Sequence, residues 1–325
     1  MANNMKLELS NEQKKRIELA VLSGLGTSKW EIYRLLHGGL SGAATYLLSA
    51  RDKSYVVKLE ETENAKIDFD RYMKVLEIAS KQSYSPTVYY ADPENGVILM
   101  DFIDGKPCNY SSHETVKNFA EFIKHIHSGP LFPKWLSIFD VLDHFYNTLD
   151  DKYKNSDILM KNMEMIQTLK DELSDPADVR PCHNDINPGN LLFDGAHLFL
   201  VDWVSASPQN FYFDLSCCAI FFYHANNELL ELFLHSYFGR ELTKDEKLKF
   251  SLMRQFANIY FGIGFLSVSS RGTNDLPALS SEEISSLPAY SNFMKGVGSG
   301  QINLGDSGKQ QSLGYIFLKT ALRNE

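Results

Sequence analysis

Several features that mark other classes of protein are scarce in this sequence of 325 residues. No run approaches the roughly 18 apolar residues of a membrane helix, and residues 1–18 are polar and charged, without the apolar segment of a secretory signal. The few cysteines lack the spacing of a metal site, and such a set is typical of free thiols in a reducing compartment. We therefore expect a soluble, cytoplasmic protein without a membrane span. The cysteines are Cys108, Cys182, Cys217 and Cys218.

Basic charge is also in short supply. The 32 lysines and arginines are outnumbered by 41 aspartates and glutamates, which gives a formal net charge of -9. An acidic chain is a poor partner for nucleic acid or an anionic membrane surface, and it suits a cationic small molecule. Because 44% of the residues are hydrophobic, a chain of this length can bury the cores of two domains or lobes.

The most informative segment is the run from 181 to 202, which contains His183, Asp185, Asn190 and Asp202. Phosphoryl transfer from ATP needs a carboxylate at the attacking hydroxyl, and an amide oxygen and a second carboxylate to hold Mg²⁺. Any one of these residues alone could be a turn former. All four in this order, around two apolar runs, predict Asp185 as the catalytic base and Asn190 and Asp202 as metal ligands. We expect His183 to hold the loop in shape.

A glycine-rich segment and a lysine upstream predict the nucleotide site. Lys58 ends a strand-like apolar run, sixteen residues after the last glycine of a short loop. Glycines let backbone N–H groups approach phosphate oxygens closely, and a strand-end lysine can bind the same phosphates. We expect ATP to be bound by Lys58 and by the loop residues Gly38, Gly39, Ser41 and Gly42.

The predicted phosphate-binding lysine needs a carboxylate partner on the helix that follows. Asp70 is the first choice and Glu77 the second, because the spacing does not decide between them.

A short apolar segment, 98–102, is expected to join the two lobes. The backbone carbonyl and N–H groups of 100–102 would bind adenine, with apolar walls from Met100 and Phe102 on either side of Asp101.

Periodicity and capping signals predict a small antiparallel sheet domain over 1–100 and a larger, mainly helical domain over 101–325, hence an α+β class. A hairpin within the second domain carries the predicted chemistry, and the glycine-rich stretch 296–311 is expected to be a loop. The expected helices are 10–22, 68–80, 112–126, 138–153, 156–173, 226–237, 244–266 and 312–323, and the expected strands are 33–37, 45–50, 54–59, 86–91 and 97–102.

These motifs resemble those of the choline/ethanolamine kinase and aminoglycoside phosphotransferase superfamily, and are closest to bacterial choline-kinase-like proteins. The resemblance rests on 183–190 as the catalytic loop, 38–41 as the phosphate loop and 211–215 as an aromatic run that ends in Phe-Asp-Leu. It implies a two-lobed protein-kinase-like fold, with ATP and Mg²⁺ as cofactors. Asn184 stands where protein kinases have arginine and no Ala-Pro-Glu follows, which favours a small-molecule acceptor. Asp214 is expected to brace the catalytic loop.

The acceptor is less defined. The resemblance favours an amino alcohol such as choline or ethanolamine, and aromatic rings between Trp203 and Tyr223 are candidates to surround a cation. Choline kinases usually have an acid two positions after the metal aspartate, but Val204 stands there, which leaves choline itself open. Most of these rings are better explained as core residues.

Two alternatives remain. An aminoglycoside phosphotransferase would need an acidic cleft, which Asp275, Glu282 and Glu283 could supply. A non-catalytic nucleotide-binding protein of the same fold would normally have lost one of the key residues, and the sequence keeps all of them. They are Lys58, Asp185, Asn190 and Asp202.

Overall fold

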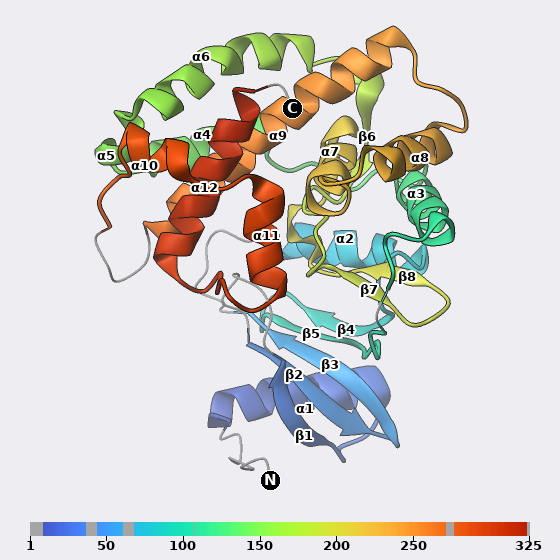
Figure 1. Ribbon diagram of the computed structural model, residues 1–325. Coiled ribbons are helices and arrows are strands. Elements are labelled where there is room, and N and C mark those ends of the chain that lie inside the picture. Colours follow the sequence, from blue (N-terminus) through green and yellow to red (C-terminus); the bar gives the residue numbers. More distant parts are fainter. Residues whose placement is uncertain (1–8, 37–43, 61–67, 107, 271–275, 324–325) are drawn as a thin grey trace. The chain divides into compact units, whose positions relative to one another are not determined.

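The computed structural model describes residues 9–36, 44–60, 68–106, 108–270 and 276–323 (Figure 1). The chain forms two compact units. Unit 1 comprises Met1–Asn109, Gly129–Pro133 and Asp185–Ala206, and unit 2 comprises Tyr110–Ser128, Lys134–Asn184 and Ser207–Glu325.

Unit 1 is built on a five-stranded antiparallel sheet in the order β1-β2-β3-β5-β4. The central strand β3 carries Lys58, which lies opposite Thr45 on β2 and Ile98 on β5. The described part of the unit also contains helices α1 and α2, a two-stranded hairpin of β7 and β8, and the 3₁₀ turn η2. Its elements are α1 (Asn11–Leu25), β1 (Glu31–Leu36), β2 (Ala44–Ala50), β3 (Lys53–Leu59), α2 (Phe69–Lys81), β4 (Val88–Asp92), β5 (Val97–Asp101), β7 (Leu191–Phe193), β8 (Leu198–Leu200) and η2 (Trp203–Ser205).

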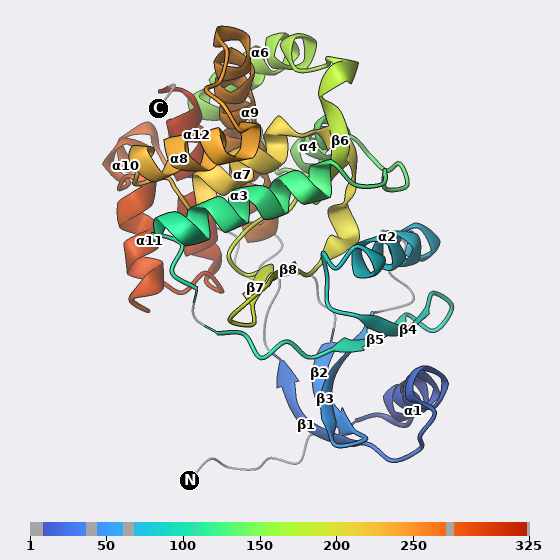
Figure 2. The ribbon, with the colours of Figure 1, turned by 90° about the vertical axis from the view of Figure 1, so that its right-hand side faces the viewer.

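Helix α1 begins where its sequence predicts and extends to Leu25, three residues beyond the predicted end. The Ser10 and Gln13 side chains form a capping box at its start, and Gly26 ends it with a left-handed φ of 64°, a conformation that glycine adopts without cost. The buried face of α1, with Ile17 and Val21, packs with the apolar side chains of the sheet, and both views show the helix beside the strands (Figures 1 and 2).

Unit 2 is mainly helical. Its longest helix, α9, packs against α7 and α12, and α3 packs against α8 (Figure 2). Helices α9 and α12 meet at Gly262 and Gly314, where a Cβ on Gly314 would lie 2.8 Å from the Gly262 carbonyl oxygen, so a side chain cannot fit without movement. The elements are α3 (His113–His127), α4 (Ile138–Asn147), α5 (Asp151–Lys154), α6 (Asp157–Glu172), η1 (Pro176–Asp178), β6 (Val179–Cys182), β9 (Ser207–Asn210), α7 (Tyr212–Phe221), α8 (Asn227–Phe238), α9 (Lys244–Ser269), α10 (Ser281–Ser286), α11 (Tyr290–Gly298) and α12 (Ser307–Ala321).

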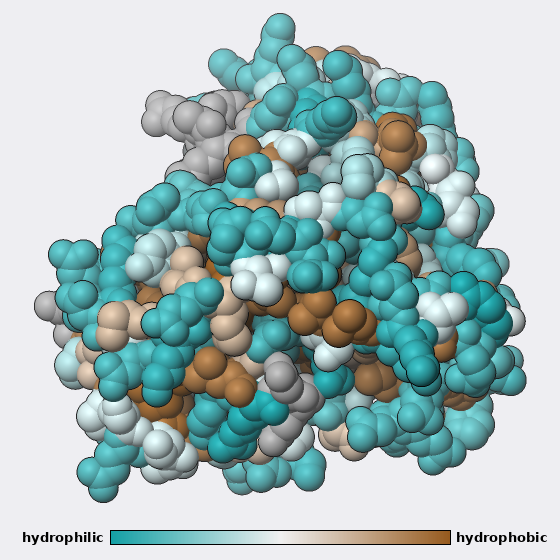
Figure 3. Space-filling view, turned by 90° about the horizontal axis from the view of Figure 1, so that it is seen from above, coloured by the Kyte–Doolittle hydropathy of each residue, from teal (hydrophilic) through white to brown (hydrophobic). Residues whose placement is uncertain are grey.

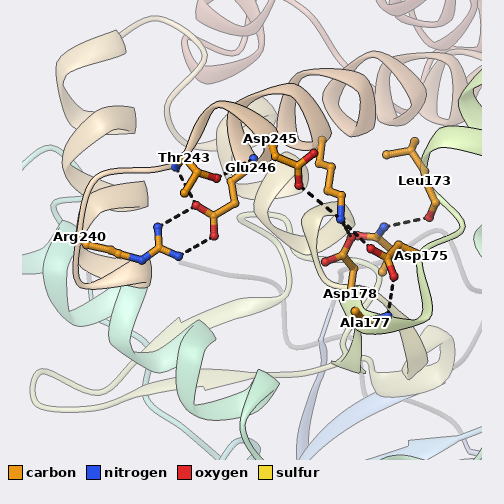
Figure 4. Close-up of polar contacts among 10 residues, drawn as sticks. Leu173, Asp175, Ala177, Asp178, Arg240, Thr243, Asp245 and Glu246 are labelled. Atoms are coloured by element: carbon orange, nitrogen blue, oxygen red, sulfur yellow. Dashed lines mark hydrogen bonds and ion pairs between the residues drawn. The ribbon is translucent and has the colours of Figure 1, made fainter.

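The start of α9 carries a dense set of ion pairs. Thr243 and Glu246 form a capping box, and Arg240 holds the same glutamate with two hydrogen bonds of 2.7 and 2.8 Å (Figure 4). One turn further, three carboxylates converge on the Lys249 ammonium, those of Asp175 and Asp178 at 2.9 and 2.8 Å and that of Asp245 at 3.7 Å. The hydrogen bond from Arg240 lowers the pKa of Glu246 to about 2.

The predicted helices and strands are present, with ends that differ by a few residues, except where two predictions are wrong. The helix expected over 138–153 is two helices, because Asp150 adopts an extended conformation as the N-cap of α5. The loop expected over 296–311 is shorter at both ends, since α11 extends to Gly298 and Asp306 caps α12, which begins at Ser307. Helices α7, α10 and α11 and strands β6 and β9 were not predicted. In α7 nearly every residue is buried, so no amphipathic pattern marks it.

None of the helices in the described part of the chain has the length and apolar character needed to cross a membrane. Figure 3 shows a face on which hydrophilic residues predominate and hydrophobic ones occur in small groups.

Candidate active site

Asp185, the predicted base, follows β6 in the loop that leads to β7. Two amide side chains from the same loop hold its carboxylate. Asn187 Nδ2 lies 3.1 Å from Oδ1 and Asn190 Nδ2 lies 2.8 Å from Oδ2. Asn190 also donates to the Asp185 carbonyl oxygen at 2.9 Å. The carboxylate is therefore fixed in orientation while its side chain stays partly exposed.

The two residues before this base are held by a buried carboxylate. Asp214 on α7 is fully buried, and it accepts the backbone N–H groups of His183 and Asn184, both at 2.8 Å. Asn184 has a left-handed φ of 64° and its side chain donates to Ser207 Oγ at 3.0 Å. His127 Nε2 lies 3.1 Å from the same Asp214 carboxylate. The prediction that Asp214 braces the loop is confirmed, and His183 lies fully buried within it.

Asn190 and Asp202, the predicted metal ligands, lie at the same end of the β7–β8 hairpin. The register pairs Leu191 with Leu200, and the Val201 N–H donates to the Asn190 carbonyl oxygen at 2.9 Å. The chain then turns sharply, because Asp202 has left-handed backbone angles of 63° and 60°.

The donor set at this end fits Mg²⁺. The Asn190 amide nitrogen donates to Asp185, so the amide oxygen is the atom of this side chain that would bind a metal. The Asp202 side chain is 29% exposed, so its carboxylate is accessible. An amide oxygen and a carboxylate suit a hard cation that takes its remaining ligands from water and phosphate.

Lys58 on β3 reaches this carboxylate. Its Nζ lies 3.4 Å from Asp202 Oδ1, 2.7 Å from Glu60 Oε1 and 5.7 Å from the centre of the Tyr72 ring. Burial disfavours the ammonium, but Tyr72, Asp202 and Glu60 outweigh it and raise the pKa of Lys58 above its ordinary value. The lysine is therefore a fixed positive charge beside the candidate metal ligand.

The predicted partner of this lysine was wrong. Asp70 is exposed on α2. Glu77, two turns further along the same exposed face, pairs with Lys81 at 2.6 Å. The helix buries its other side, so neither carboxylate points to Lys58. Glu60 pairs with it instead. The strand period of two places 58 and 60 on one face, a signal that the sequence contains.

The rest of the predicted nucleotide site is less fully described. Gly38, Gly39, Ser41 and Gly42 lie outside the described residues. Among the three residues predicted to bind adenine, two belong to β5 and the third follows it: Met100, Asp101 and Phe102.

The backbone of Asp101 is already engaged. Its N–H donates to the Thr87 carbonyl oxygen at 2.9 Å, and its side chain accepts from the Tyr89 hydroxyl at 2.9 Å. The Asp101 N–H is therefore not available to adenine. The predicted hydrogen bonds to adenine are then left to the backbone groups of the neighbouring residues.

Most rings proposed for a cation cage belong to the core. Trp203 is fully buried between Tyr84 and Phe132, and its indole N–H donates to the Leu200 carbonyl oxygen at 2.9 Å. Phe213 is also fully buried. The other buried rings in this run are Phe211, Tyr212 and Tyr223. The core interpretation of these rings is thus confirmed, and it leaves only the half-buried Phe221 and Phe222 accessible.

The carboxylates named for an aminoglycoside cleft give it little support. Glu283 is engaged in the capping box of α10 with Ser280, and Glu282 is exposed in the same first turn. Asp275 lies outside the described residues.

A comparison with protein families matches residues 32–248 to the phosphotransferase enzyme family. This range takes in every residue proposed above for catalysis, metal or nucleotide.

Two curated relatives, both named Protein LicA and both from Haemophilus influenzae, are 25% identical over 176 residues, or 52% of this chain. The match spans 65% of one relative and 51% of the other, less than two thirds of either.

Solved structures show the same fold. Choline kinase LicA from Streptococcus pneumoniae has a TM-score of 0.65 at 18% identity, covering 88% of this chain and 99% of that one. Spectinomycin phosphotransferase APH(9)-Ia, in complex with ADP and spectinomycin, has a TM-score of 0.55 at 15% identity, covering 93% and 98%. The likenesses confirm the predicted two-lobed α+β fold of the protein-kinase type.

Proposed function

The chain belongs to the phosphotransferase enzyme family, and we propose that it transfers the γ-phosphate of ATP to the hydroxyl group of a small amino alcohol such as choline or ethanolamine. The observation that carries this proposal is one connected set of side chains in unit 1. Lys58 contacts Asp202, the Asp202 turn is tied to Asn190 through the hairpin, and Asn190 holds Asp185.

Each member of the set has a distinct task in the proposed reaction. Lys58 binds the phosphates through its ammonium group, which its surroundings keep protonated. Asp202 and the Asn190 amide oxygen would hold Mg²⁺, which when bound would neutralise negative charge on the phosphate oxygens. Asp185 accepts the hydrogen bond of the acceptor hydroxyl, orients it, and takes its proton as the hydroxyl oxygen bonds to the γ-phosphorus, while the bond from that phosphorus to the bridging oxygen breaks and ADP leaves.

The loop geometry supports this role for Asp185. Two amide donors on its carboxylate and the Asp214 brace on the preceding backbone fix where the proton acceptor lies. Preorganisation of this kind is the main contribution that a protein makes to phosphoryl transfer.

The net charge of -9 favours a cationic acceptor of either kind. An amino alcohol in particular is supported by the similar solved structures, which include a protein described as choline kinase. The likeness to spectinomycin phosphotransferase supports the second candidate, an aminoglycoside acceptor.

The test is ADP release with Mg-ATP and a panel of acceptors. We expect turnover with choline or ethanolamine, and much less with 3,3-dimethylbutanol, the neutral isostere of choline, because a cation site gives little to a neutral alcohol. Asp185→Asn is the control for acceptor-dependent turnover. Equal efficiency on choline and its isostere, or turnover only with spectinomycin or another aminoglycoside, would overturn the amino-alcohol proposal.

A further inference from the structure

Arg71 and Tyr72 are consecutive buried residues of α2, and each contacts a different part of the candidate site. The Arg71 guanidinium donates to the Ala206 carbonyl oxygen at 2.7 Å and to the Val204 carbonyl oxygen. Lys58 Nζ lies over the Tyr72 ring. Both side chains are almost fully buried, at 5% and 1% exposure, and both lie in unit 1. One turn of α2 therefore contacts the segment after Asp202 and the phosphate-binding lysine together.

The two carbonyls that Arg71 binds flank the end of η2. This 3₁₀ turn, Trp203–Ser205, begins directly after Asp202, and carbonyl groups at the end of a helical turn lack donors within it. Arg71 supplies those donors from another element. A guanidinium is costly to bury, and burial lowers the pKa of Arg71 while Asp68 opposes that effect. An apolar residue would fill the space without this cost, but it would leave the two carbonyls without these donors.

The turn that Arg71 holds is the one that aims the metal ligand. Asp202 is a non-glycine residue in the left-handed region, a conformation that Cβ crowding disfavours and that persists only when its surroundings impose it. On one side of the turn, the Trp203 indole donates to Leu200. On the other side, Arg71 fixes Val204 and Ala206. The carboxylate direction depends on both anchors.

We propose that Arg71 is a positioning residue for the metal-binding carboxylate of Asp202, and that α2 thereby links the metal ligand to Lys58 without the carboxylate of Asp70 or Glu77. This inference rests on the proposed function only in its assignment of Asp202 to Mg²⁺. It says nothing of the acceptor.

The test measures nucleotide binding by titration calorimetry, with no acceptor present. Each protein is titrated with ATP in excess Mg²⁺ and with ATP in EDTA. In Arg71→Met we expect Mg-ATP affinity to fall about tenfold, as for the loss of hydrogen bonds from a charged donor, and metal-free ATP affinity to change less than about twofold. Arg71→Lys, which keeps a cationic donor but not the fork, should recover part of the loss.

Arg16 provides a matched control. It lies on α1 in the same unit and also donates to two backbone carbonyl oxygens, those of Glu60 and Gly96, both at 2.7 Å. Arg16→Met should lower the melting temperature, yet leave the ratio of Mg-ATP to metal-free affinity unchanged. The ratio of the two ATP affinities therefore distinguishes a change in the position of Asp202 from a general loss of stability.

The outcomes are distinct. Equal weakening of both forms of ATP in Arg71→Met, or the same selective loss in Arg16→Met, would overturn the role of Arg71. If Arg71→Met does not fold, the comparison of Arg71→Lys with wild type decides, because an unchanged affinity ratio there also overturns it. A wild-type protein that binds Mg-ATP but phosphorylates no amino alcohol would overturn the proposed acceptor while leaving this inference standing.

Discussion

Asp214→Asn tests whether one buried carboxylate holds the catalytic loop in its working shape. The carboxylate accepts two backbone N–H groups at 2.8 Å and faces His127 Nε2 at 3.1 Å. An asparagine of the same size has one oxygen and one NH₂ group, so at least one N–H then meets a donor. The substitution also removes the charge that strengthens the remaining hydrogen bonds.

The magnitude follows from these contacts. A hydrogen bond to a charged group contributes about 1.5–3 kcal/mol, and a buried donor left unsatisfied costs about 1–3 kcal/mol. We expect a total destabilisation of about 3–5 kcal/mol, similar to that for breaking a buried pair. In a unit of this size, that lowers the melting temperature by roughly 10 °C. The loop would also lose the support of the strained Asn184, so turnover should fall at temperatures where the protein is folded.

Thermal unfolding and acceptor-dependent ADP release measure the two effects. Asp178→Asn is the control, because Asp178 is also a poorly exposed aspartate of unit 2. Its partner Lys249 would still be paired with Asp175 after the substitution. It should shift the melting temperature by only a few degrees and leave turnover unchanged. If Asp214→Asn matches this control in stability and retains near-normal turnover, the brace is not what holds the loop.

Three further perturbations address the remaining groups. Asp185→Ala should abolish phosphoryl transfer and leave Mg-ATP binding nearly unchanged in calorimetry, because the proposed role of the residue is to accept the proton of the acceptor hydroxyl; turnover within a few-fold of wild type would refute that role. Asp202→Asn should severely weaken Mg-ATP binding, and unchanged affinity would contradict its assignment as a metal ligand. The pKa of Glu246 is depressed from 4.5 to about 2, so its contribution is present above about pH 4.5 and is lost as the pH falls toward 2. Glu246→Gln should therefore lower the free energy of unfolding at pH 7 by about 1 kcal/mol and should reduce the loss of stability in acid. Melting temperatures measured across a pH series test both effects, and an unchanged dependence on pH would show that other groups cause the acid-induced loss.

The sequence predicts the parts of the fold where local pattern and tertiary structure agree. The capping box of Ser10 and Gln13 marks the start of α1, and alternating apolar residues mark β2 and β3. It does not predict α7, because that helix is buried on all sides and lacks the period that marks a surface helix.

The same contrast applies to the site. Asp185, Asn190 and Asp202 occur in one short stretch, so their order alone predicts them. The predicted partner of Lys58 was wrong because Asp70 was chosen by its charge, whereas its position on α2 places it on the face of the helix that is exposed to solvent. The proposed role of Arg71 has no sequence signal, since its side chain binds backbone carbonyl oxygens, which any residue provides.

The β7–β8 hairpin has a consequence for how such sites can diverge. The second proposed metal ligand lies twelve positions after the first in the sequence, yet the ladder between Leu191 and Leu200 brings both to one end of the hairpin. The turn around Gly195 lies at the other end, where lengthening a loop costs little, about 0.6 kcal/mol per doubling. Insertions there would change the interval between the ligands without moving either one. An Asn and an Asp on either side of a short hairpin, at any interval, are thus a better search pattern for this chemistry than a fixed count of residues.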